Sequence, residues 1–438
     1  MDDLKDPNEN AWYILSTLYG ELSADMDDDE ARELNKRNAD AWNVWVRRHL
    51  SSEAVAQYEA LTDLTLNDPT PRFWTEFHNQ VAIRSIGMGL EIPETFERVN
   101  LSSLHFTRPV SFANRFFPSV TFANSCFEEN VEFGRSVFSK TAEFSRATFK
   151  KDAFFIRSHF AGDALFRGRL PGEDPKKTPL PAAFGPRTFF SGARFAQRAD
   201  FFCRRFGPDD GKVTDISFAN AVFDGPLSFE EAPFTDLMPV LTNTTFPNAS
   251  KVTASADYWP KLRPSPVGRL IRYIQNGPET YTTQKPETVK ASAATLRHAM
   301  SRQMLPEEEH FFFRREMWGA ARSGPLMARP LIWLFGAVSN YGHSVGRPSL
   351  CLGALWLAGF ATFSNQSYGD NLILGSWEAA FFSFANMFKF FGLLDTYFDG
   401  VAGGFPERIQ VLAGAQTVLA FILLFFLGLG LRTRFRLR

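Results

Sequence analysis

A phenylalanine recurs every five or six residues in three runs, at positions 106–166, 190–206 and 218–234. Two residues before most of them stands a small or β-branched residue, such as Val131 before Phe133 or Ala142 before Phe144. A period of five fits neither an α-helix, with about 3.6 residues per turn, nor an ordinary strand. It predicts a solenoid that turns a corner every five residues, in which the Phe and the small residue both point inward. The phenylalanines predicted to form this core are Phe112, Phe117, Phe122, Phe127, Phe133, Phe138, Phe144, Phe149, Phe155, Phe160, Phe166, Phe195, Phe201, Phe218, Phe223 and Phe229.

The repeat has two irregular features. Steps of six residues imply one-residue bulges at corners, and they leave the register between successive turns of the solenoid open. Residues 171–187 are rich in turn-forming Pro and Gly, so we expect an insertion there. A shorter interruption is expected at 208–213.

The motif of a small residue, a polar residue and a central Phe resembles the pentapeptide-repeat family over residues 101–235. The resemblance implies a right-handed quadrilateral β-helix with four repeat units in each coil. The expected fold class is therefore mixed: this β-helix at 96–250, an acidic helical N-terminal region at 1–95, and transmembrane helices at the C-terminus. A linker and helical hairpin are expected at 251–325, and a membrane domain at 326–438.

Two uncharged apolar segments predict membrane spans at about 348–364 and 409–431. Arginines gather before the first segment and after the second, while the loop between them holds few basic residues. The distribution predicts that both termini and the repeat domain face the cytoplasm. An interfacial helix is expected at 330–338, ahead of the first span.

The segment between the two spans, 374–394, is too apolar for a free loop and suggests a re-entrant helix. Helix, re-entrant helix and helix is the plan of a two-span channel subunit. Candidate pore-lining residues are Asn386, Lys389 and Gly392. The Thr and paired Gly residues of a potassium filter are missing, so potassium selectivity is not expected. The alternative is that Lys389 extends to the membrane surface from an interfacial helix.

Composition and charge narrow the class of protein. The chain has 47 Phe but only 9 Tyr and 9 Trp, as expected where one ring shape is used repeatedly. Its net charge is −1, divided into −11 for residues 1–100, +3 for 101–235 and +7 for 236–438. No nucleic-acid partner is expected, because the repeat region is neither strongly basic nor an acidic mimic of DNA. A basic C-terminal part instead suits the anionic face of a membrane.

The chain offers little that resembles catalytic chemistry. Its three cysteines are far apart, and no nucleophile–histidine order, nucleotide loop or metal-ligand spacing is evident. We therefore expect no enzyme activity, cofactor or metal. The segments around 341–348 and at the C-terminus are similar to bacterial membrane-anchored pentapeptide-repeat proteins, which implies the bacterial inner membrane. The leading hypothesis is a membrane-tethered scaffold that binds an unknown protein. The alternative is an oligomeric, channel-like effector.

Overall fold

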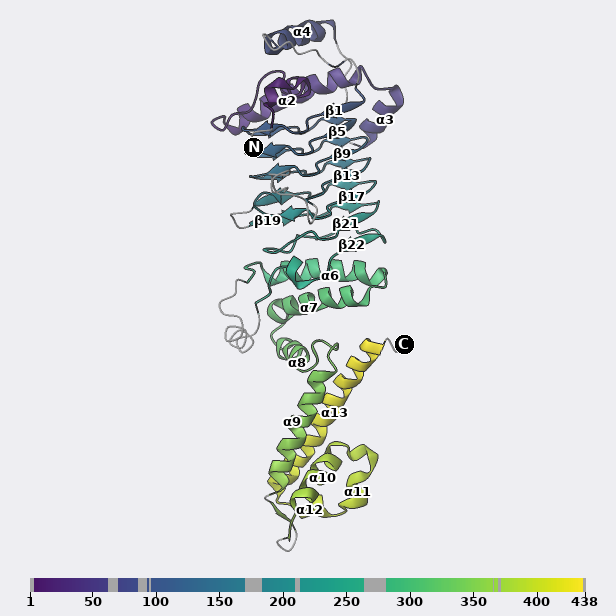
Figure 1. The fold of residues 1–438 in the computed structure, drawn as a ribbon. Coiled ribbons are helices and arrows are strands. Elements are labelled where there is room, and N and C mark those ends of the chain that lie inside the picture. Colours follow the sequence, from purple (N-terminus) through teal and green to yellow (C-terminus); the bar gives the residue numbers. More distant parts are fainter. Residues whose placement is uncertain are drawn as a thin grey trace. The chain divides into compact units, whose positions relative to one another are not determined.

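The repeat region consists of short parallel strands that stack in several sheets (Figure 1). The computed structural model describes residues 4–61, 70–85, 93, 96–169, 183–208, 213–263, 281–364, 366–368 and 372–435. The chain divides into two compact units, Met1–Gly319 and Ala320–Arg438, and the strand stack belongs to the first.

Four sets of strands make up the stack. The longest sheet contains β1 (Arg98–Asn100), β5 (Ser119–Thr121), β9 (Ala142–Glu143), β13 (Ala164–Leu165), β17 (Ala199–Asp200), β21 (Leu227–Phe229) and β22 (Ser250–Val252). The second set contains β2 (His105–Phe106), β6 (Cys126–Phe127) and β10 (Thr148–Phe149), together with the separate pair β14 (Ala183–Phe184) and β18 (Arg205–Phe206). The third contains β3 (Val110–Ser111), β7 (Val131–Glu132), β11 (Ala153–Phe154), β15 (Arg187–Phe189) and β19 (Asp215–Ser217). The fourth contains β4 (Phe116–Phe117), β8 (Val137–Phe138), β12 (His159–Phe160), β16 (Arg194–Phe195) and β20 (Val222–Phe223).

The chain contributes one strand to each of the four sets in turn and then begins again with the first set. One passage through all four sets is called a circuit. In the pairings from β1 to β21, a strand pairs with the strand four places later. Val120, Ala142 and Ala164 lie in register in the longest sheet, so one circuit there takes 22 residues. Backbone hydrogen bonds between successive circuits therefore satisfy groups that a single two-residue strand would leave unpaired.

The six-residue steps follow a rule that sets the register. Between Phe127 and Phe166 the steps alternate strictly between six and five. Each five-residue step after Phe133, Phe144 or Phe155 contains a left-handed residue two positions after the Phe, with φ between 56° and 57°. The left-handed turn closes its corner with one residue fewer. The step of six is therefore a second kind of corner, and it recurs in every circuit of this region.

The core of the stack is made of phenylalanine columns. All sixteen phenylalanines predicted to point inward are at most 3% exposed. Their rings stack face to face between circuits: Phe122, Phe144 and Phe166 have centroids 5.0 and 4.8 Å apart, and their planes are within 7° of parallel. Rings of neighbouring columns meet edge to face, as Phe144 and Phe155 do at 89°. Stacked and edge-to-face pairs are both favourable ring geometries, so the repeated choice of Phe has a direct packing reason.

The predicted insertion at 171–187 is too long at its C-terminal end. Ala183–Phe184 is strand β14 and Arg187–Phe189 is strand β15. The ring of Phe184 continues a column, with centroids 5.1 Å from those of both Phe149 and Phe206. The repeat resumes with Ala-Ala-Phe at 182–184, a signal that the Pro and Gly residues nearby obscured. Residues 171–182 lie outside the described residues.

Helices cover the N-terminal end of the stack. They are η1 (Pro7–Glu9), α1 (Ala11–Ser16), α2 (Asp28–Arg47), α3 (Ser52–Leu61) and α4 (Pro71–Ser85). Asp27 begins α2 by accepting hydrogen bonds from the backbone of residues 29 and 30. The buried Trp42 of α2 lies on Phe117 at a centroid distance of 5.3 Å, and its indole Nε1 donates to the carbonyl of Phe116 at 2.8 Å. The helix thus buries the Phe rings at the N-terminal end of the stack, which would otherwise face water.

The C-terminal end of the stack is covered in the same way. After η2 (Ala256–Tyr258), Trp259 stacks on Phe234 at 5.2 Å and meets Phe312 edge to face at 5.0 Å. Phe312 belongs to α7 (Pro306–Ser323), which is joined to α6 (Pro286–Arg302) by an ion pair of 2.6 Å between Arg297 and Glu316. Figure 1 shows α6 and α7 beyond β22, where they close this end of the core.

The second unit is mainly helical. Its helices are α8 (Arg329–Ser339), α9 (Gly346–Phe363), α10 (Ser376–Met387), η3 (Lys389–Phe391), α11 (Leu393–Tyr397), α12 (Val401–Gly404) and α13 (Glu407–Phe435). A short antiparallel pair, β23 (Ser367–Tyr368) and β24 (Leu372–Ile373), follows α9. Helices α9, α10 and α13 all pack against one another. Among the described residues, α13 alone is long and apolar enough to cross a membrane.

Candidate functional site

A groove of about 690 Å³ runs over the longest sheet, from β5 to β22. The groove is lined by residues of successive strands that point away from the core. Side chains alternate along each strand, so the Phe points inward and its neighbours point outward. Its lining includes Glu143, Ser145, Arg167, Asp200, Ser228 and Lys251. The groove therefore presents side chains beside six neighbouring strands of this sheet on one face.

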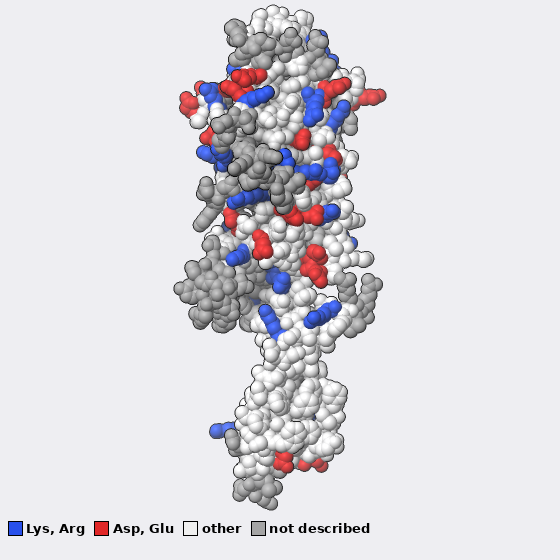
Figure 2. All heavy atoms as spheres, in the orientation of Figure 1, with Lys and Arg blue, Asp and Glu red and all other residues white. Residues whose placement is uncertain are grey.

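The charges of the groove alternate in sign. Arg167 Nε donates to Asp200 Oδ2 at 2.8 Å, and Lys251 Nζ lies 3.6 Å from Glu230 Oε2. Arg198, also in the lining, pairs with Asp163 at 3.0 Å. Figure 2 shows basic and acidic side chains intermingled over the strand stack. Such a surface offers both donors and acceptors at the spacing of the strands, which suits a polar peptide or protein partner better than a polyanion.

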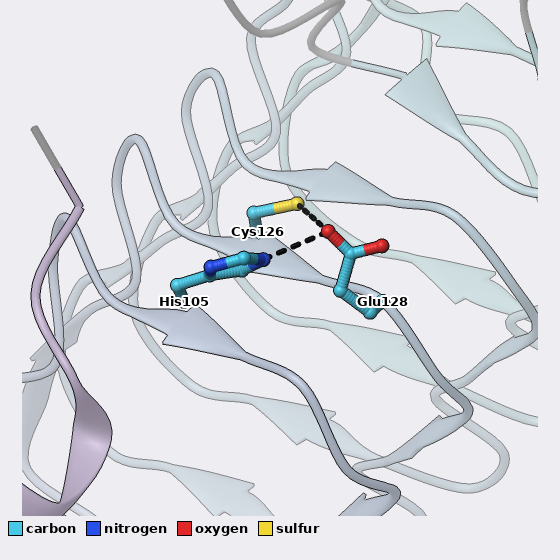
Figure 3. Close-up of side chains that lie close together, drawn as sticks. All are labelled: His105, Cys126 and Glu128. Atoms are coloured by element: carbon cyan, nitrogen blue, oxygen red, sulfur yellow. Dashed lines mark hydrogen bonds and ion pairs between the residues drawn. The ribbon is translucent and has the colours of Figure 1, made fainter. Parts of the chain in front are cut away.

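A second cluster lies on the sheet that contains β2 and β6 (Figure 3). His105 and Cys126 are directly opposite each other across the two strands, and Glu128 points to the same side two residues later. His105 Nε2 lies 2.8 Å from Glu128 Oε1, and Cys126 Sγ lies 3.7 Å from the same oxygen. Lys150 Nζ contacts the carboxylate at 2.8 Å. We call His105, Cys126 and Glu128 the His–Cys–Glu cluster.

The protonation of this cluster follows from burial and charge. Burial, reinforced by the negative charge of Glu128, raises the pKa of the Cys126 thiol to about 12. Partial burial raises the pKa of Glu128, but hydrogen bonds from Lys150 and His105 outweigh it and bring that pKa below its ordinary value. The carboxylate is therefore charged at neutral pH and accepts from three neighbouring groups.

The three candidate pore residues lie in different environments. Asn386 in α10 is 3% exposed, and its Nδ2 donates to the carbonyl of Ala413 at 2.9 Å and to Gln416 Oε1 at 2.8 Å. Lys389 in η3 is exposed, and Gly392 follows with a φ of 71°. Within one chain, Asn386 thus links α10 to α13 by hydrogen bonds. The buried Asn386 and the exposed Lys389 do not share one polar surface.

Two features of the core could not be read from the repeat. Arg115 and Arg204 occupy the inward position two residues before a Phe, where the pattern places a small residue, and both are fully buried. Arg115 donates to the carbonyl of Ser16 at 2.9 Å and so connects the stack to α1. Arg204 lies over the ring of Phe184 at 4.2 Å, a cation–π contact. Burial lowers the pKa of each guanidinium to about 9.

Sequence reasoning also missed the groove and the His–Cys–Glu cluster. The signal for the cluster was present: His105 and Cys126 are 21 positions apart, which is one circuit in this part of the stack. Comparison of the chain with protein-family profiles, curated proteins and solved structures finds no significant match.

Proposed function

We propose that this protein is a membrane-tethered scaffold whose strand stack binds another protein. In this account the stack is a right-handed quadrilateral β-helix of pentapeptide repeats, supported by the rotation through four sets of strands and by the four Phe columns. The groove over the longest sheet carries the proposal, because it aligns paired charges of both signs on a rigid surface.

The tether is helix α13. It has 29 residues, about 44 Å at 1.5 Å per residue, which exceeds the roughly 30 Å of the hydrocarbon core. Its apolar side chains are widely exposed within the unit, Val411 at 71% and Phe421 at 67% among them. Such exposure is costly in water and favourable in lipid. We further propose that α9 is a second span, that both termini are cytoplasmic, and that the membrane is the bacterial inner membrane.

Rigidity supports the role of the stack as a binding surface. Its groove residues stand on strands whose backbones are hydrogen-bonded on both sides, as β13 is to β9 and β17. A partner that binds there orders few side chains, and little conformational entropy is lost. The groove has no nucleophile poised beside a base in the part of its lining that the structure describes, so binding is favoured over catalysis.

A charge reversal in the groove tests the proposal. Arg198→Glu reverses the charge of a groove residue and turns its ion pair with Asp163 into a repulsion, whereas Arg194→Glu does the same to the pair with Asp224 on the fourth set of strands. The two pairs are matched in length, 3.0 and 2.9 Å, and both are exposed. After chemical crosslinking in membranes, quantitative mass spectrometry should show the same partner with the parent and with Arg194→Glu, and its loss with Arg198→Glu. Equal recovery from both variants would show that the groove does not bind the partner.

A channel-like effector is the second candidate. The observation that favours it is the short helix α10, which lies between α9 and α13 and contacts both, as a pore helix does in a two-span subunit. Reconstituted protein should then form a closed oligomer, and Lys389→Glu should change its ion flux. A silent monomer or dimer would remove this candidate and leave the scaffold.

A further inference from the structure

The His–Cys–Glu cluster brings together three different ligand atoms on one outer face of the stack. His105 Nε2, Cys126 Sγ and one carboxylate oxygen of Glu128 all lie within 4.8 Å of one another (Figure 3). Imidazole, thiolate and carboxylate together are a donor set that suits Zn²⁺, a borderline-soft cation. Strand pairing fixes the arrangement, because His105 and Cys126 are cross-strand partners and Glu128 follows on the same side of β6.

We propose that His105, Cys126 and Glu128 bind one Zn²⁺ ion. The site would tie the first circuit, through β2, to the second, through β6. The Cys126 thiol proton would be released to solvent as the thiolate binds, and Lys150 would leave the Glu128 carboxylate. The proposal does not depend on the scaffold function.

The spacing of the ligand atoms suits a tetrahedral ion. Zinc–nitrogen and zinc–oxygen distances near 2.1 Å and a zinc–sulfur distance near 2.3 Å place pairs of ligands about 3.4–3.6 Å apart. Two of the distances here are 2.8 Å, between His105 and Glu128, and 3.7 Å, between Cys126 and Glu128. The third pair, His105 and Cys126, lies within 4.8 Å, so shifts of about 1 Å in the partly exposed His105 and Glu128 side chains would bring all three ligands to these spacings without movement of the buried Cys126.

Two neighbours are consistent with a cation at this position. Lys150 already places its ammonium group 2.8 Å from Glu128, so the carboxylate attracts positive charge in the absence of metal. Thr148 is the next residue in register after Cys126, and its buried hydroxyl has no hydrogen-bond partner among the described residues. A water on the fourth position of the ion would offer that hydroxyl a partner.

Metal titration of the full-length protein in detergent tests the proposal. Co²⁺ should bind one per chain and give a thiolate-to-metal charge-transfer band, and Zn²⁺ should displace it. Cys126→Ser should abolish the band, and His105→Gln and Glu128→Gln should each weaken binding about tenfold or more. Circular dichroism would confirm that each variant is folded.

Two further variants separate the site from adventitious binding. Cys203→Ser removes a cysteine whose Sγ also lies near a carboxylate, 3.3 Å from Glu231, and it should leave the titration unchanged. Lys150→Met frees Glu128 and should tighten binding. A titration without the thiolate band, or one that is insensitive to His105→Gln and Glu128→Gln, would overturn the site. So would weaker binding in Lys150→Met.

Discussion

The register of the Phe columns can be tested on two adjacent residues, Phe154 of β11 and Phe155, which directly follows that strand. Phe154 and Phe155 are neighbours in sequence, but the structure places Phe155 in the core at 0% exposure and Phe154 on the outside. Phe155 stacks on Phe133 and Phe190 at 4.8 and 4.7 Å. The ring of Phe154 stacks on Phe189 at 5.5 Å. A shift of one residue in the repeat would exchange their environments.

The expected magnitudes differ clearly. Replacing a buried Phe by Ala removes its hydrophobic contribution and leaves a cavity, which together cost about 3–5 kcal/mol. Because Phe155 also meets Phe144 and Phe166 edge to face at 5.3 Å, Phe155→Ala should fall in the upper part of that range. Phe154→Ala removes a partly exposed ring and should cost about 1 kcal/mol or less.

Hydrogen exchange on the full-length protein measures these costs locally. A loss of about 3–5 kcal/mol corresponds to a fall of about 140- to 3,700-fold in the protection of the amides of β7, β11 and β15, because about 1.4 kcal/mol is tenfold. Phe154→Ala should change protection by less than about tenfold. Equal losses in the two variants, or a larger loss in Phe154→Ala, would refute the assignment of the inward positions.

Three other outcomes follow from the structure. Gly359→Ala should destabilise the second unit in a detergent melt, because its Cβ would clash with the buried side chains of Gln416 and Ser383, whereas Gly353→Ala on the same helix meets nothing within 4 Å and should be tolerated. Burial lowers the pKa of His159 below its ordinary value of 6.5. The stability that the neutral, buried His159 contributes is therefore complete above pH 6.5 and is lost as the pH falls from 6.5 towards the lower pKa of the folded state. His159→Asn should then flatten the acidic side of a plot of melting temperature against pH. Arg204→Met should increase the free energy of unfolding by about 1–3 kcal/mol and so raise the melting temperature. The substitution removes a buried guanidinium with no hydrogen-bond partner among the described residues and keeps an apolar contact with Phe184. A lower melting temperature would show that the cation–π contact outweighs desolvation.

The periodic part of the fold could be predicted because one position dominates its packing. Every Phe expected to be inward, from Phe112 to Phe229, is buried. The corner rule could not be predicted, because the left-handed conformation falls on Asn124, Arg135 and Cys203 alike, and these residue types share no obvious signal. Phe184 was missed because Pro181 shortly before it and Gly185 and Pro186 directly after it are residues that normally mark a loop.

The candidate sites depend on contacts between residues of neighbouring circuits. These contacts cannot be predicted from the sequence unless the register between the circuits is known. Arg167 and Asp200 are 33 positions apart and pair only because an insertion lengthens their circuit. His105 and Cys126 meet because their circuit takes 21 residues. The second membrane span stays a prediction: α9 begins with Gly-Arg-Pro-Ser, which shortens its apolar part. The candidate pore residues also remain a prediction, although Asn386 makes its hydrogen bonds within its own chain.

A photo-crosslinking scan on the intact protein in membranes tests the central claim, that the groove of a membrane-tethered stack binds a partner protein. A photoreactive residue would replace in turn Glu143, Ser145 and Ser228 in the groove, and then two exposed control residues, Glu132 of β7 and Arg135 in the turn after it. We expect the groove positions to crosslink to one partner in the membrane fraction and the control positions not to do so. Crosslinks of equal yield from both faces, or none from the groove, would contradict the central claim.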